Sequence, residues 1–164
     1  MSTRDADLAK LRRAALDEPR NGERRYLLGA ELAEQRDYEG AVLELSAAIA
    51  LSPLLHVARL QLGLLHLTLA QPDHALHVLA PLEDLPDESP LKHFKRGLEA
   101  LIRDDFAACV SALEHGIALN QDNAPLNADM RLIVSQVQST VETNRESQDP
   151  SAVRTDFSLY GMRH

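Results

Sequence analysis

The chain has 164 residues, enough for one domain with its own hydrophobic core and too few for two ordinary domains. Hydrophobic residues make up 45% of it and charged residues 26%, which excludes a disordered or membrane-embedded chain, and the 4% of aromatic residues predicts an aliphatic core between helices. The net charge of −8 repels phosphate backbones and anionic lipid, so nucleic acid is not expected as a partner.

The N-terminal region predicts a cytoplasmic location and no membrane insertion. Its first residues, MSTRDADLAKLRR, contain no apolar stretch of signal-peptide length, and no segment of the chain has the roughly 20 apolar residues of a membrane-spanning helix. Cys109 is the only cysteine, so the chain cannot form an internal disulfide. A basic cluster lacks interleaved aromatic residues and is interpreted as solvated helix surface: Arg12, Arg13, Arg20, Arg24 and Arg25.

Residues 22–55 are predicted to form a helical hairpin. The run GERRYLLGAELAEQ carries apolar residues at helical spacing and stops at the turn Arg36-Asp37. The run YEGAVLELSAAIALSP resumes that spacing and ends at Pro53, which cannot continue a helix. Two helices joined by so short a turn must lie antiparallel.

The hairpin pattern returns in residues 56–89 and 90–123. Gly29, Gly63 and Gly97 recur at one constant spacing, a period of thirty-four positions. Small residues stand twelve positions after these glycines and leucines sixteen positions after them: Ala41, Ala75 and Cys109, then Leu45, Leu79 and Leu113. Because helices with narrow apolar stripes must approach closely, each glycine is expected to face the small residue twelve positions later.

The pattern also extends toward both ends of the chain. Residues 1–21 place Leu11 one full period before Leu45, and are predicted to form an N-terminal capping helix equivalent to the second helix of a truncated repeat. Residues 124–147 contain the amphipathic run ALNADMRLIVSQVQSTVETN and are predicted to form a C-terminal capping helix.

This arrangement resembles the tetratricopeptide repeat (TPR), a helical hairpin of about 34 residues with a Leu-Gly pair in its first helix, an Ala early in its second and a Pro at its end. The first repeat matches at Leu28, Gly29, Leu32, Tyr38, Ala41, Leu45, Ala48 and Pro53. The second departs at Arg59, His66 and Pro72, and the third at Arg96 and Gly116. The resemblance implies an all-α fold, a right-handed α-solenoid of antiparallel helix hairpins (a TPR superhelix), and a role in binding other polypeptides.

The resemblance also implies where a ligand would bind, because the first helices of such repeats line a concave surface. One face of these helices is apolar throughout and is the predicted peptide-binding groove: Tyr26, Ala30, Ala33, Leu60, Leu64, Leu67, Phe94, Leu98 and Leu101, with Leu132 added by the C-terminal cap. Repeats that clamp a terminal carboxylate carry Lys and Asn on this face, so an apolar helix or extended segment is the expected ligand. The alternative is that these residues only pack helix against helix.

Residues 148–164 break the repeat pattern and form an apolar tail. Its large side chains are Phe157, Leu159, Tyr160 and Met162, too few for a core of their own.

The leading interpretation of the chain is an adaptor or chaperone-like protein that binds an apolar segment of a client, with an architecture similar to the small bacterial chaperones of type III secretion translocators. The alternative is an oligomerisation module, a homodimer for example, in which the tail docks into a groove of its own or a neighbouring chain.

Catalysis is not expected. The chain has no Gly-rich phosphate loop, no GxSxG and no HExxH, so no cofactor is expected either. His74 and His77, with His66 nearby, are the best metal ligands on offer, yet no patterned carboxylate or thiolate completes the set, and a metal-binding protein is the third interpretation. Cys109 is expected to be an inert packing residue, not a nucleophile paired with His115.

Overall fold

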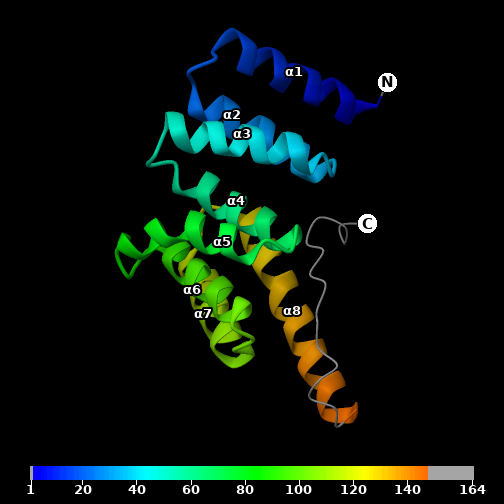
Figure 1. Ribbon diagram of the computed structural model, residues 1–164, viewed down its shortest axis with the longest axis vertical. Helices are drawn as coiled ribbons and strands as arrows, with labels where there is room; N and C mark the ends of the chain where they lie inside the picture. Colours follow the sequence, from blue (N-terminus) through cyan, green and yellow to red (C-terminus); the bar gives the residue numbers. More distant parts are fainter. Residues whose placement is uncertain (1, 148–164) are drawn as a thin grey trace.

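The computed structural model describes residues 2–147, and the regular elements within this range are all helical (Figure 1). They are α1 (Thr3–Asp17), α2 (Gly22–Glu34), α3 (Tyr38–Leu51), α4 (His56–Thr68), α5 (Pro72–Leu79), the 3-10 helix η1 (Ala80–Asp84), α6 (Pro90–Ile102), α7 (Phe106–Leu119) and α8 (Ala124–Ser147). The all-α class predicted from the sequence is therefore confirmed.

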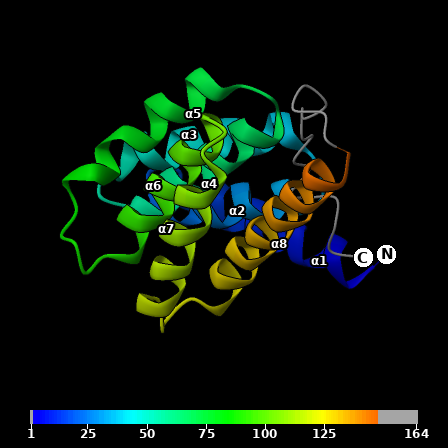
Figure 2. The same ribbon diagram turned by 90° about the horizontal axis from the view of Figure 1, so that it is seen from below.

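The helices pair in chain order into antiparallel hairpins, α2 with α3, α4 with α5 and α6 with α7. The hairpins stack into a solenoid, with α1 at the N-terminal end of the stack and α8 at the other (Figure 1). Figure 2 shows α3 and α5 on one side of the stack and α8 on the other, with α2 and α4 between them. The predicted α-solenoid is confirmed by this arrangement.

Each repeat glycine marks a close helix crossing, and its nearest neighbour is a leucine. A Cβ atom placed on Gly63 would lie 2.5 Å from Leu79 Cδ2 and 2.6 Å from Leu79 Cγ, closer than real carbon atoms approach. The equivalent pairs in the other repeats are Gly29 with Leu45 and Gly97 with Leu113. The leucine one helical turn beyond the expected small residue thus fills the space that each glycine leaves, and at Gly97 the backbone oxygen of Cys109, the small residue expected there, also lies 3.3 Å from the added Cβ.

The turn inside each repeat follows the same period. Arg36, Ala70 and Asp104 have φ angles of 63°, 56° and 58° and are spaced along the chain as the repeat glycines are. After each of them a backbone N–H donates back to the first helix, as Gln71 N does to His66 O at 2.8 Å. This is the C-terminal cap in which a residue in the left-handed αL conformation lets the following N–H bond to a carbonyl of the last helical turn. Here the αL residue is not a glycine.

The second repeat differs from the others because its second helix is short. α5 ends at Leu79 and is followed by η1, which contains Pro81. The α-helix cannot continue regularly through Pro81, because proline lacks the N–H that a longer helix would need. Ion pairs hold the irregular segment on α6. Lys95 Nζ lies 2.9 Å from a carboxylate oxygen of Glu83 and 2.9 Å from one of Glu99, and Arg96 also pairs with Glu83.

The pKa values of this cluster reflect the pairing. Hydrogen bonds from Arg96 and then Lys95 lower the pKa of Glu83 to about 2. Burial lowers the pKa of Lys95, but its hydrogen bonds to Glu83 and Glu99 outweigh that effect and the pKa is raised. Lys95 is therefore a charged residue whose buried position is compensated by two carboxylates.

Candidate protein-binding surfaces

The structure buries most of the predicted concave groove. Six of its ten residues are core residues with at most 8% of their surface exposed: Ala33, Leu60, Leu64, Phe94, Leu98 and Leu101. The other four are partly buried: Tyr26, Ala30, Leu67 and Leu132. The expectation of an open groove along this stripe is corrected for the six core residues, because side chains with at most 8% of their surface exposed offer almost no surface to a ligand.

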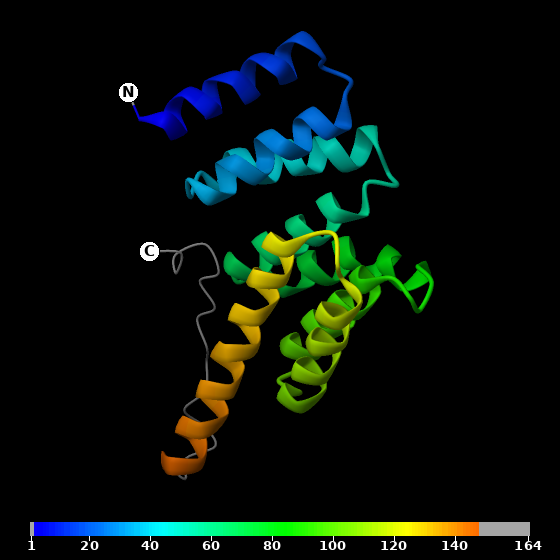
Figure 3. The same ribbon diagram turned by 180° about the vertical axis from the view of Figure 1, so that it is seen from behind.

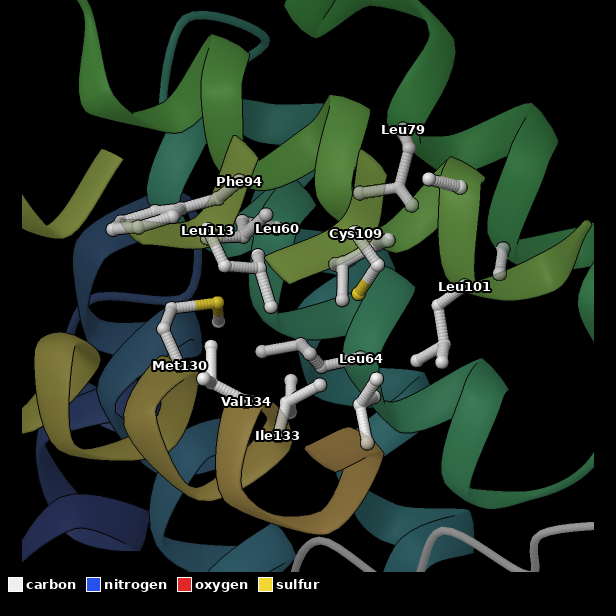
Figure 4. Packing of buried hydrophobic residues seen from close by; sticks show 14 of the residues in the cluster. Leu60, Leu64, Leu79, Phe94, Leu101, Cys109, Leu113, Met130, Ile133 and Val134 are labelled. Atoms are coloured by element: carbon white, nitrogen blue, oxygen red, sulfur yellow. The ribbon is translucent and has the colours of Figure 1, made fainter. Parts of the chain in front are cut away.

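Helix α8 is the element that covers the stripe. Met130, Ile133 and Val134 on α8 point toward Leu60 and Leu64 on α4 (Figure 4). Seen from behind, α8 begins in front of the middle of the stack and runs past α7 (Figure 3). The helix predicted from the sequence as a C-terminal cap therefore also fills the concave surface with apolar side chains.

Two further observations place the start of α8 firmly in the stack. Asn120 and Asn127 are both buried and exchange hydrogen bonds, Asn120 Nδ2 to Asn127 Oδ1 at 2.9 Å and Asn127 Nδ2 to Asn120 O at 2.8 Å. Burial and then the Asp129 carboxylate raise the pKa of Tyr26, so α8 acts on the first repeat as well as the third. For the six buried residues of the stripe, the structure shows the alternative weighed from the sequence, packing of helix against helix.

A first accessible depression, here called the N-terminal groove, lies between α1 and α3 and has α2 as its floor. Its volume is about 330 Å³. Leu28 and Leu32 form the buried floor, and Leu16 and Leu43 stand on opposite walls with 74% and 66% of their surface exposed. The groove exists because α1 packs chiefly on α2 and leaves the adjoining face of α3 uncovered.

Charged groups surround the N-terminal groove. Arg25 and Glu44 line it as an ion pair with 3.0 Å between Nη1 and Oε2. Asp37 also lines the groove, but its carboxylate serves as the N-cap of α3, where Oδ1 accepts a hydrogen bond from the N–H of Gly40 at 3.0 Å. Arg12 lies on the rim and forms no ion pair within residues 2–147. The site thus combines an apolar floor with one positive charge that is unmatched among the described residues.

A second depression, here called the C-terminal groove, lies between α7 and the second half of α8. Its volume is about 650 Å³. The apolar lining residues are Phe106, Val110, Val137 and Val141, and the polar ones are Ser111, Glu114, Gln138, Glu142 and Arg145, with Ala107 between them. The two helices are joined at the Asn120–Asn127 end, and α8 is 24 residues long against 14 for α7, so the outer half of α8 has no helix over it in the described chain.

The residues considered for chemistry do not form a catalytic or metal site. His66 Nδ1 lies 2.8 Å from Gln71 Oε1, and its ring stacks on His74 with 5.3 Å between centroids. Within the described part of the chain, no three His, Cys, Asp or Glu side chains are grouped to hold a metal. Cys109 is fully buried, and burial followed by the Asp105 charge raises the pKa of its thiol to about 12, so the thiolate nucleophile is not formed near neutral pH.

Two further expectations from the sequence concern the apolar tail and membrane insertion. The tail residues Phe157, Leu159, Tyr160 and Met162 lie outside the described residues. None of the helices within residues 2–147 is long and apolar enough to cross a bilayer.

Sequence reasoning missed both grooves because it concentrated on the TPR signature positions. Leu16 and Leu43 are not signature residues, and the only signal available was that each puts a large apolar side chain where the helical pattern predicts a solvated face. Phe106 and Val110 gave no signal, because they fit the repeat pattern and become accessible only where α8 leaves α7.

Comparison with known proteins identifies the fold. No protein-family model matches the sequence, and no curated protein matches it. Among solved structures, the chain is similar to MamA 41-end from Desulfovibrio magneticus RS-1, with a TM-score of 0.58 and 20% sequence identity over 90% of this chain and 89% of that one. It is also similar to the MamA RS-1 ArsTM double mutant, with a TM-score of 0.57 and 20% identity over 90% and 88%. The likeness covers nearly all of both chains, and the TPR-type solenoid predicted from the sequence is confirmed.

Proposed function

We propose that this chain is a protein-interaction scaffold that binds an apolar, helical segment of a client protein in the N-terminal groove. The observation that carries the proposal is the pair of exposed leucines, Leu16 and Leu43, facing each other across a floor made by Leu28 and Leu32. Adaptor and chaperone-like roles both fit such a scaffold. Catalysis, a cofactor and nucleic acid have no part in the proposal.

The hydrophobic effect favours a ligand that covers the exposed leucines of the N-terminal groove. Covering the two exposed leucines would stabilise a complex by about 1.5–3 kcal/mol for each side chain that becomes fully buried. An amphipathic helix is the ligand with the right shape, since its apolar residues at i, i+3, i+4 and i+7 can lie along a groove walled by two helices. An acidic residue at its edge would meet Arg12, whose charge is unmatched among the described residues.

The test is a selection of helical peptides from a random display library against three forms of the chain. The wild type should enrich peptides with the i, i+3, i+4, i+7 apolar pattern and an acidic flank. Leu16→Ser with Leu43→Ser should lose them without loss of stability, because both side chains are already exposed. Leu54→Ser is the matched control, being 83% exposed and outside the groove. Equal enrichment by all three forms would refute the site.

The alternative is an oligomerisation module that uses the tail, and one observation favours it. The C-terminal groove ends at Arg145, close to the last residue of α8, Ser147, so it lies beside the point from which residues 148–164 continue. Light scattering decides between the proposals: a dimer for the full chain and a monomer for a chain ending at residue 149 would favour oligomerisation through the tail.

A further inference from the structure

The flank of α8 lacks the following helix that every other first helix of the solenoid has. α2, α4 and α6 each pack between two helices, the one before and the one after, whereas α8 has α7 before it and no helix after it within residues 2–147. In sequence register α8 is a fourth first helix, since Arg131 stands one full period after Gly97. It does not turn where the earlier repeats turn but continues to Ser147.

The C-terminal groove beside α8 has a partly exposed apolar lining. Val141 on α8 and Phe106 and Val110 on α7 are partly buried side chains of this lining, and Val137, fully buried, lies at its base. Apolar surface of this kind is usually covered by another part of the chain or by a partner. An occupant with both apolar and charged side chains fits the groove, because its lining combines these apolar residues with Glu114, Glu142 and Arg145.

We infer that residues 157–162 of the same chain occupy the C-terminal groove in cis. This assignment is separate from the client site at the N-terminal groove, and neither depends on the other. The sequence FSLYGM supplies Phe157, Leu159, Tyr160 and Met162, large side chains to pack on the apolar part of the groove's lining.

The chain is long enough to reach the groove. Residues 148–156 separate Ser147 from Phe157, and nine residues span up to about 30 Å when extended. The distance back from the end of α8 to the groove is shorter, since the helix rises only about 9 Å from Val141 to Ser147. A linker of this length holds the segment at an effective concentration on the order of millimolar, above that of any second chain, and this favours binding in cis.

The charges that line the C-terminal groove are complementary to those around residues 157–162. Glu114 and Glu142 line the groove near Arg145. On either side of residues 157–162 the chain carries Arg154 and Arg163, to pair with the glutamates, and Asp156, to pair with Arg145. Such rim pairs contribute little energy but fix which way the segment lies.

The test follows the methyl NMR signals of Val110 and Val141 in the full chain, in a chain ending at Ser147, and in the full chain with Phe157→Ser and Leu159→Ser. We expect both valines to shift equally in the two altered chains, while the methyl signals of Leu54, exposed elsewhere, stay where they are. Because the substitutions lie outside the folded repeats, loss of folding does not complicate the result. Unchanged valine signals in either altered chain would overturn the inference.

A second measurement separates binding in cis from exchange between chains. A labelled peptide of residues 150–164 should bind the chain ending at Ser147 at least about 10-fold more tightly than it binds the full chain, whose groove is already occupied. Equal binding to both would overturn the inference. Light scattering should give a monomer for the full chain, and a dimer that depends on the tail would assign the segment to the neighbour's groove and overturn the cis assignment.

Discussion

Replacing Ile133 with alanine tests the central structural correction, that α8 fills the concave surface. Ile133 is fully buried in the cluster that also contains Leu60 and Leu64. The substitution removes three carbon atoms, which at about 0.8 kcal/mol each gives about 2.4 kcal/mol before any cavity is counted. Ile133→Ala should therefore lower the free energy of unfolding by about 2–5 kcal/mol, as other buried Ile to Ala changes do.

The assay is urea unfolding followed by circular dichroism, with thermal unfolding as a check. For a chain of this size the melting temperature should fall by roughly 2–4 °C for each kcal/mol lost. Ser135→Ala is the control, since Ser135 lies on the exposed face of the same helix and its replacement should change stability by less than about 0.5 kcal/mol.

The result that would refute the reasoning is an Ile133→Ala variant as stable as the control. It would mean that α8 does not belong to the core in solution and that the concave stripe is open, as the sequence had suggested. Amide hydrogen exchange gives an independent readout. Protection of α8 amides equal to that of α4 amides is expected if the two helices unfold together.

Three further predictions concern single residues. Ala70→Gly should raise the free energy of unfolding by about 0.5–1 kcal/mol in urea titrations, because Ala70 has a φ of 56°, whereas Ala50→Gly, inside α3, should lower it by a similar amount. Glu83, with a folded pKa of about 2 against an ordinary 4.5, contributes stability that is present above pH 4.5 and lost as the pH falls toward 2, so Glu83→Gln should flatten that part of a plot of melting temperature against pH. A melting temperature of Glu83→Gln that falls with pH as steeply as that of the wild type would contradict this role. Cys109 should react with iodoacetamide only as fast as the chain unfolds, and fast alkylation of the native protein would contradict its burial.

The sequence by itself determined the repeat and the fold class. The constant period of Gly29, Gly63 and Gly97, with apolar residues at helical spacing around each, is a local property that needs no knowledge of distant contacts. The turns are local in the same sense, since the helical spacing of apolar residues stops at the turn residues themselves, as at Arg36-Asp37 and Pro53. One local detail came only from the structure: the nearest neighbours of the glycines are the leucines sixteen positions later, with Cys109 also close to Gly97.

Only the tertiary structure decided which apolar surface is accessible. The stripe through Leu60, Leu64 and Leu98 reads the same in sequence whether it is open or covered, because periodicity shows that a face is apolar without showing what lies against it. The angle at which α8 crosses the stack depends on packing between segments far apart in the chain. That crossing buries most of the predicted groove and leaves the groove beside Val110 open, while the packing of α1 on α2 leaves the groove beside Leu43 open.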